Sequence, residues 1–246
     1  MSINITGIIG VKNVNLSAAG GPPPPANYSN LFNGSNNFLS VADNAAFDVS
    51  TGNFTTEAWI YPTGDTTPVG RFFLGKANSG SFGPFALGFE GGVDQLIGLS
   101  SISGAGWEIQ CLTTGNPNTS WNTLKNKWSH VAFVRNGSTF TLYLNGVNVS
   151  STSSGASLVQ NNELVTIGRT NYPDTNFPGY ISNLRIVKGT AVYTGNSFSV
   201  PTSPLTNISG TSLLTCQSAT IVDNSSNAFA ITNNNGVTVN SLNPFN

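Results

Sequence analysis

Charged side chains are scarce in this chain. Its 246 residues include nine Lys or Arg and ten Asp or Glu, 8% of the total, against roughly 25% in an average soluble protein. The formal net charge is −1, so the sequence carries no basic surface of the kind that binds nucleic acid or anionic membranes. No apolar run approaches the roughly 20 residues that a membrane helix needs. We therefore expect no nucleic acid and no membrane among the partners of this protein.

Chemically reactive residues are also few. Cys111 and Cys216 are far apart and match no metal or redox spacing, so we expect two buried free thiols. His130 is the only histidine, and no cysteine or serine–acid pair accompanies it, so we expect a structural role. Glycoside hydrolysis needs two converging carboxylates, and the closest acidic pair, Glu90 and Asp94, is interrupted by a Gly-Gly turn. We expect no catalytic residues and a protein that is not an enzyme.

The first 26 residues differ in composition from the rest of the chain. Apolar residues alternate loosely there and are followed by two glycines and a run of four prolines, which favours an extended polyproline II spacer. We expect an N-terminal arm over residues 1–26 that docks on a neighbouring subunit, and the alternative is a frayed tail. The residues expected to form this arm are Ile3, Ile5, Ile8, Val11, Val14, Leu16, Pro22, Pro23, Pro24 and Pro25.

What the chain has in abundance is Asn, Ser and Thr, with Gly and Pro between runs of β-branched and aromatic residues. These residues are poor helix formers, and the runs are spaced as in a β-sandwich. Residues 27–246 are therefore predicted to form one all-β domain with too many strands for a seven-strand immunoglobulin sandwich. The predicted strands are residues 38–41, 54–61, 71–76, 85–89, 96–100, 107–112, 128–135, 139–144, 164–168, 179–188, 212–216, 229–233 and 237–240.

Two of these strands carry more specific expectations. Residues 128–144 read as a β-hairpin around Asn136-Gly137, which suits a type I′ turn, and Asn145-Gly146 ends its return strand. In residues 54–61, neither set of alternate positions is cleanly polar, since one set contains Glu57 and Trp59 and the other is largely apolar. We expect this strand to be an inner one, with a ligand, a sheet or a partner covering its outer side.

Several motifs resemble a known family. Residues 32–41 (FNGSNNFLSV), 52–62 (GNFTTEAWIYP), 128–135 (WSHVAFVR), 142–146 (LYLNG), 167–168 and 179–186 (GYISNLRI) are similar, in order, to the laminin-G-like jelly roll of the concanavalin A-like lectin/glucanase architecture. The resemblance implies two large antiparallel sheets packed face to face in a jelly-roll sandwich. Residues 188–195, 212–218 and 222–229 resemble the C-terminal stretch of jelly rolls in virion proteins of tailed phages, those of cyanobacterial phages above all.

Relatives of this kind often hold Ca²⁺ through aspartate and backbone oxygens, which suit this hard ion. An acidic position common in such jelly rolls is Ser182 here, and the other acidic loop residues fit ordinary turns. We therefore expect no metal site and no other cofactor, with Ca²⁺ as the one open alternative. The loop residues that remain for it are Asp43, Asp65, Asp174 and Asp223.

A glycan site needs exposed aromatic rings that stack on sugars and neutral or acidic groups that bond hydroxyls. The loop 170–178 offers such residues in one stretch, and two tryptophans lie near another loop. The alternative is that these aromatic residues plug the ends of the sandwich or form subunit contacts. The candidate carbohydrate-binding residues are Asn171, Tyr172, Asp174, Asn176, Phe177, Trp107 and Trp121.

The phage resemblance implies a virion structural protein, a capsid decoration or a tail or fibre component, docked by its arm. We expect it to be a homo-oligomer, a trimer above all, in contact with other virion proteins. Residues 1–12 lack a basic region, a long apolar segment and a small-residue cleavage site, so assembly in the host cytoplasm is expected. The alternative function is a lectin-like module that recognises a host surface polysaccharide.

Overall fold

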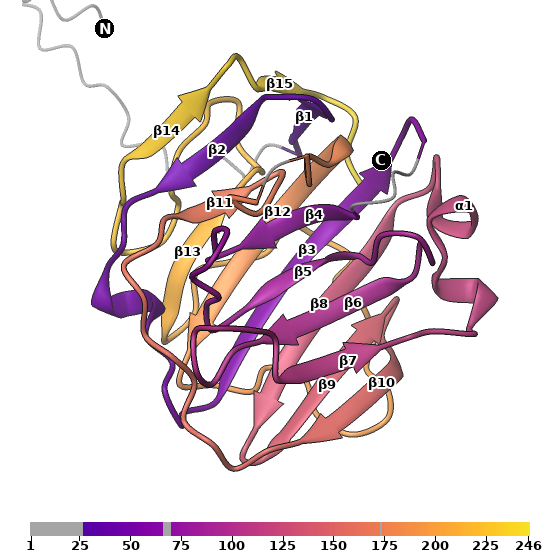
Figure 1. The fold of residues 1–246 in the computed structure, drawn as a ribbon. Coiled ribbons are helices and arrows are strands. Elements are labelled where there is room, and N and C mark those ends of the chain that lie inside the picture. The colour runs from indigo at the N-terminus through magenta and orange to yellow at the C-terminus, as the bar shows by residue number, and fades with distance from the viewer. Residues whose placement is uncertain (1–26, 66–69, 173) are drawn as a thin grey trace, which may run out of the picture.

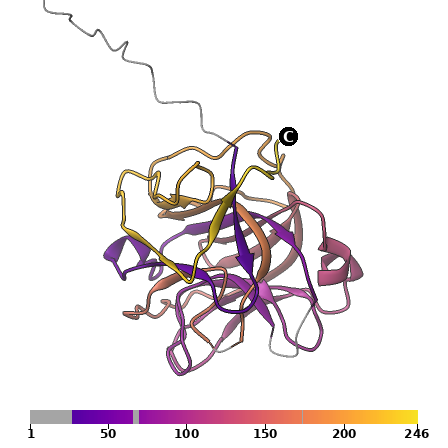
Figure 2. The same ribbon diagram turned by 90° about the horizontal axis from the view of Figure 1, so that it is seen from above.

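Two antiparallel sheets packed face to face make up the protein (Figure 1). The computed structural model describes residues 27–65, 70–172 and 174–246, so the arm predicted for residues 1–26 lies outside the described residues. The prediction of an all-β sandwich is confirmed. Viewed from above, the two sheets lie one over the other (Figure 2).

The first sheet has eight strands. Its long inner strand β12 carries two neighbours on the same side, because β1 pairs with residues 178–181 and β13 pairs with residues 184–187. In sheet order the strands are β10 (Val147–Ser153), β9 (Thr139–Leu144), β8 (Ser129–Asn136), β3 (Phe54–Pro62), β12 (Pro178–Lys188), β1 (Ser29–Asn33) and β15 (Thr238–Asn240), with β13 (Thr211–Thr215) beside β12.

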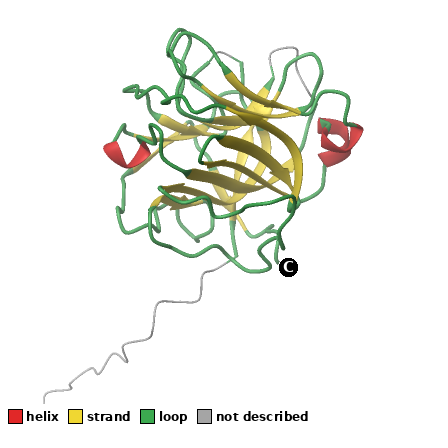
Figure 3. Cartoon of the chain, turned by 90° about the horizontal axis from the view of Figure 1, so that it is seen from below, coloured by secondary structure: helices red, strands yellow, loops and turns green. Residues whose placement is uncertain are grey.

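The second sheet has seven strands: β14 (Ile231–Asn234), β2 (Phe38–Val41), β11 (Val165–Ile167), β4 (Arg71–Gly75), β5 (Ala86–Phe89), β6 (Leu96–Ser100) and β7 (Ile109–Leu112). Short helical turns lie at opposite sides of the sandwich (Figure 3); they are η1 (Ala45–Phe47), η2 (Pro117–Thr119) and α1 (Trp121–Leu124). Within the described part of the chain, no helix is long and apolar enough to cross a membrane.

The main core lies between the sheets and is rich in phenylalanine. Phe54 of β3 contacts the rings of Phe85, Phe133 and Phe140, with centroids 5.6 to 6.3 Å apart. All four side chains are fully buried, and burying an aromatic ring of this size contributes about 1.5–3 kcal/mol. These contacts join the two sheets, because Phe54, Phe133 and Phe140 belong to the eight-stranded sheet and Phe85 lies beside the other.

The outer side of β3 is covered, as its sequence predicts, and the cover is the chain itself. Residues 190–206, called the strap here, run over the outer face of the eight-stranded sheet. Thr55 bonds the strap twice, donating to the Thr190 carbonyl at 3.0 Å and accepting from the Val192 N–H at 2.9 Å. Further along, Tyr193 and Phe198 pack against buried residues of β8 and β9. A second apolar cluster therefore lies outside the sandwich core.

The hairpin of β8 and β9 is present, but its turn lies one residue further along the chain than predicted. Asn136 pairs with Thr139, so Gly137 and Ser138 form the two-residue loop. Only Gly137 of these two has a positive φ, 61°, which fits a type II′ turn rather than type I′. Asn145 and Gly146 both have positive φ, 49° and 78°, and they form the next hairpin turn, between β9 and β10.

Two strands were not predicted, β1 and β10. In β1 (SNLFN) the two apolar residues are adjacent, and in β10 (VNVSSTS) only the first three residues alternate, so neither shows the sustained apolar alternation that marks a strand. β10 pairs with one neighbour only, at the edge of its sheet. Polar residues are tolerated there, because an edge strand buries little of its surface. The other predicted strands match observed ones, with ends that differ by two residues at most.

Candidate functional site

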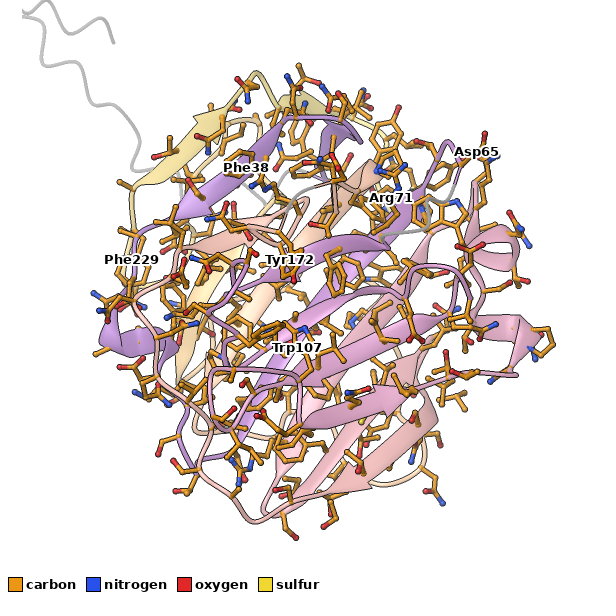
Figure 4. All side chains as sticks on the ribbon, in the orientation of Figure 1. Phe38, Asp65, Arg71, Trp107, Tyr172 and Phe229 are labelled. Carbon is orange, nitrogen blue, oxygen red and sulfur yellow. The ribbon has the colours of Figure 1, made fainter. Side chains whose placement is uncertain are left out.

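A pocket lined by aromatic rings opens on the outer face of the seven-stranded sheet. Figure 4 shows Trp107 and Tyr172 close together over the middle of this face. The pocket has a volume of about 230 Å³ and is lined by Phe72, Ala77, Phe82, Trp107, Thr170, Tyr172 and Thr175. Phe82 contacts Trp107 edge-on, with ring centroids 5.1 Å apart, and lies 6.3 Å from Tyr172. We call it the aromatic pocket.

The strand β4 supplies one wall of the pocket because its neighbour β5 carries a glycine. Phe72 pairs with Gly88, and a Cβ added at Gly88 would lie 2.6 Å from Cδ1 of Phe72. Any other residue at position 88 would therefore displace the ring. Phe72 and Trp107 also cover the outward residues Ile97 and Leu99.

Backbone hydrogen bonds join the loops that carry the other walls. Asn171 N–H donates to the Ala77 carbonyl at 2.9 Å, and Phe82 N–H donates to the Gly104 carbonyl at 3.0 Å. Phe72 N–H donates to the Thr175 carbonyl at 2.9 Å. The aromatic pocket is thus formed before any ligand arrives, which lowers the entropy cost of binding.

The two threonine hydroxyls of the aromatic pocket are already bonded to the protein. The Oγ1 atoms of Thr170 and Thr175 lie 3.0 Å apart. Thr175 Oγ1 is also within reach of the Thr170 and Tyr172 carbonyls, at 3.2 and 3.0 Å. These bonds hold the turn that presents Tyr172, whose side chain is 41% exposed.

The charged groups next to the pocket are also engaged. Arg169 donates to the Thr170 carbonyl at 2.9 Å and to Asn171 Oδ1 at 2.7 Å, and its guanidinium lies over the Phe38 ring. Glu108 follows Trp107 in the chain. Burial would raise the pKa of Glu108, but hydrogen bonds from Ser103 and the loop backbone lower it to about 2. The Glu108 carboxylate is therefore negative at neutral pH.

Two of the predicted carbohydrate-binding residues, Tyr172 and Trp107, lie together in the aromatic pocket. Two others are not accessible to a ligand. Trp121 and Phe177 are fully buried, so the prediction that they stack on a sugar is wrong. Their rings pack edge-on with centroids 5.7 Å apart, and Trp121 also contacts Phe89 at 5.0 Å. They plug the end of the sandwich, which is the alternative that the sequence left open.

The polar residues of the predicted loop are spread around the pocket rather than within it. Asn176 is 6% exposed and does not line the aromatic pocket, so its contact with a ligand stays a prediction. Asn171 bonds Arg169, and Asp174 is exposed at a positive φ of 61°. Neither lines the aromatic pocket.

Sequence reasoning missed Phe72 and Phe82, which form the remaining aromatic walls. Phe72 belongs to a predicted strand, but a register shift after it places Phe73 and Leu74 both in the core, so simple alternation misassigns the faces. For Phe82 a signal was available. It stands between Gly80 and Gly83 in a loop, where an aromatic residue has no strand to pack into.

A buried polar cluster lies under the strap, on the face of the molecule opposite the aromatic pocket. Glu57 is fully buried. It accepts hydrogen bonds from Arg185 at 2.9 and 2.6 Å and from the Tyr193 hydroxyl at 2.7 Å, and it pairs with His130 Nε2 at 3.0 Å. Burial would raise the pKa of Glu57, but His130, Arg185 and Tyr193 together lower it. His130 is thus buried and hydrogen-bonded, as predicted.

The acidic loop residues proposed for Ca²⁺ do not meet. Asp43 pairs with Lys76 at 2.8 Å and Asp65 with Lys125 at 2.9 Å. Asp223 accepts from backbone N–H groups of its own loop, among them Ser225 at 2.8 Å. Among the described residues, no three His, Cys, Asp or Glu side chains gather around a point that could hold a metal ion.

Comparison with known proteins places this arrangement in a family. Among solved structures, a candidate carbohydrate binding protein from Bacteroides ovatus ATCC 8483 matches with a TM-score of 0.61 at 20% identity, over 89% of this chain and 61% of that one. The SAP-like pentraxin from Limulus polyphemus matches with a TM-score of 0.56 at 14% identity, over 87% of this chain and 94% of the pentraxin. At these identities the likeness shows the fold alone.

The binding domain of Paraclostridial Mosquitocidal Protein 1 matches with a TM-score of 0.50 at 17% identity, over 63% of this chain and 38% of that one. This chain therefore spans less than two thirds of the length of both this domain and the Bacteroides protein. A comparison with curated proteins gave no match. The model of the concanavalin A-like lectin/glucanases superfamily matches residues 33–191. That is more than half of the sequence, so the chain belongs to this superfamily.

Proposed function

We propose that this protein is a carbohydrate-binding module that recognises its ligand without transforming it. The observation that carries the proposal is the aromatic pocket, where Trp107 and Tyr172 meet from two loops far apart in sequence. Aromatic rings bind the apolar faces of sugar rings and expose polar edges to the sugar hydroxyls. The pocket is also smaller than the roughly 300–1,000 Å³ typical of drug-sized ligands, which suits a single sugar ring. The fold-level likeness to a candidate carbohydrate binding protein supports the same proposal.

A non-enzymatic role is supported by where the carboxylates lie. Glu57 is sealed under the strap by Arg185 and Tyr193, and Glu90 and Asp94 share a turn whose Asp94 N–H donates to the Glu90 carbonyl. Glycosidic cleavage needs two carboxyl groups facing each other across a bound sugar, about 5–10 Å apart. The seven residues that line the aromatic pocket include no carboxylate.

A glycan array with the purified protein tests the proposal. We expect binding to a restricted set of glycans, and we expect Tyr172→Ala and Trp107→Ala to weaken it at least tenfold. The matched control is Tyr180→Ala, because Tyr180 is a partly exposed tyrosine on the other sheet, packed against Tyr61. A blank array, or binding that survives both pocket substitutions, would contradict the proposal.

We further propose that the module acts on a virion surface, as a capsid decoration or tail component in host-made particles. The proposal rests on the resemblance of residues 188–229 to phage jelly rolls and on the neutral Asn-, Ser- and Thr-rich composition. Deleting residues 1–25 should leave a folded domain that no longer enters particles. Truncated protein that still decorates particles normally would rule out the docking arm, and light scattering of the intact protein tests the expected trimer.

A further inference from the structure

The chemistry of the aromatic pocket restricts the kind of sugar that fits it. Four of its seven lining residues are aromatic, one is alanine and two are threonines. Both threonine hydroxyls are bonded within the protein: they bond each other, and Thr175 Oγ1 is also within reach of the Thr170 and Tyr172 carbonyls. A sugar hydroxyl placed against them would lose its bonds to water and meet groups that are already satisfied. Such an unmade bond costs about 1–3 kcal/mol.

A methyl group has no such penalty. It loses no hydrogen bond on leaving water, and contact with Phe72, Phe82 and Ala77 contributes about 25 cal/mol for each Å² of apolar surface removed from water. The interior of the pocket is therefore better matched to a methyl-bearing substituent than to a hydroxyl.

Polar groups that could bond the rest of the ligand are at the same pocket. Tyr172 is 41% exposed, and no described residue hydrogen-bonds its hydroxyl or the indole N–H of Trp107. The Tyr172 hydroxyl can donate or accept, and the indole N–H can donate. These two groups can bond ring hydroxyls or an amide carbonyl while the aromatic faces hold the ring.

Charge excludes two further classes of sugar. The pocket lining has no charged side chain. Neither the ammonium group of an amino sugar nor the carboxylate of a sugar acid would therefore find a partner of opposite charge within it, and either group would lose its hydration on entry.

We propose that the aromatic pocket selects a neutral sugar that carries a methyl-bearing substituent, an N-acetyl group or a 6-deoxy carbon, with the methyl group against Phe72, Phe82 and Ala77. This inference rests on the proposed carbohydrate-binding function and adds the class of ligand. The proposal predicts a difference in affinity between two sugars that are identical except for the methyl-bearing substituent.

Two pairs of soluble sugars test it by titration followed with ligand-observed NMR. L-fucose and L-galactose differ only in the C6 hydroxyl, and N-acetylglucosamine and glucose differ in the acetamido group. We expect the methyl-bearing member of at least one pair to bind about tenfold or more tightly, the range for one apolar group in a fitted pocket. Its methyl protons should receive the strongest saturation transfer from the protein.

Equal affinity within both pairs would overturn the selectivity while leaving the carbohydrate-binding function in place. Absence of binding to all four sugars, together with a blank array, would overturn both. Phe82→Ala opens one wall from a partly exposed loop position, and we expect it to reduce the preference below about threefold. The control Leu242→Ala, which removes an exposed apolar side chain elsewhere, should leave the preference unchanged. A preference that survives Phe82→Ala would contradict the assignment to this pocket.

Discussion

The buried carboxylate of Glu57 allows the most quantitative prediction. Its side chain is fully buried, and Arg185 is 5% exposed. Glu57→Gln keeps the size of the side chain but removes its charge and replaces one acceptor oxygen with a donor. The remaining amide oxygen can still accept from Arg185, which also keeps its bond to the Thr206 carbonyl at 2.9 Å, but the charge of Arg185 then has no buried counterion.

Breaking a buried ion pair in this way costs about 3–5 kcal/mol. For a domain of this size, each kcal/mol lowers the melting temperature by roughly 2–4 °C, so Glu57→Gln should melt about 10 °C below the wild type. Thermal and urea unfolding at pH 7 measure this. The control is Glu163→Gln, because Glu163 is partly exposed and makes no ion pair with any described residue; it should shift the melting temperature by less than about 2 °C.

The same carboxylate predicts an acid dependence. The pKa of Glu57 is lowered in the folded protein from an ordinary value of 4.5, so its contribution to stability is fully present above that value. It is lost as the pH falls from 4.5 through the lower folded pKa. Glu57→Gln should therefore lose stability less steeply than the wild type in this window. Equal melting temperatures at pH 7, or parallel acid profiles, would refute the reasoning.

Two further predictions concern the thiols and the hairpin turns. Burial raises the pKa of both Cys111 and Cys216 to about 12, so neither should react with a thiol reagent at pH 8 until urea unfolds the protein; reaction of the native protein would show that one of them is accessible. Gly146→Ala should destabilise the protein by more than 2 kcal/mol, because its φ is 78° and a Cβ would lie 2.2 Å from the Phe198 carbonyl oxygen. Gly137 also has a positive φ, but a Cβ added there would meet open space. Gly137→Ala should therefore lower the free energy of unfolding, measured with denaturant, by only about 1–2 kcal/mol. An equal loss of stability in the two variants would contradict a clash at position 146.

The fold was predictable because its signals are local. The hairpin of β8 and β9 follows from two apolar runs around Gly137, and the strands of the core follow from alternation and turn residues. The turn register was wrong by one position because Asn136 and Gly137 suit a type I′ turn by themselves, and cross-strand pairing of Asn136 with Thr139 decides otherwise. The strand β1 was missed because only one of its residues, Phe32, belongs to the main core, and β10 because its pairing with β9 holds it at the edge of the sheet.

The candidate site was predictable only in part, because the solvent exposure of a side chain depends on residues far away in the sequence. Trp107, Trp121, Tyr172 and Phe177 look alike in sequence, as aromatic residues in or near loops. The end of the sandwich takes up Trp121 and Phe177, and this depends on the distance between the two sheets. Similarly, residues 54–61 predicted that the outer side of β3 would be covered. They could not predict that the strap, more than a hundred residues later in the chain, would cover it.

The strap also explains why the candidate site lies on the seven-stranded sheet. The outer face of the eight-stranded sheet is covered by Tyr193 and Phe198, which stack with centroids 3.7 Å apart above β8 and β9. Where the strap crosses β3, the Tyr193 hydroxyl bonds Glu57, so Tyr193 and Phe198 are used for packing. On the seven-stranded sheet, Trp107 and Tyr172 instead line an open pocket. The strap and the pocket lie on opposite sides of the core, so substitutions that loosen the strap should lower stability without changing the ligand preference of the pocket.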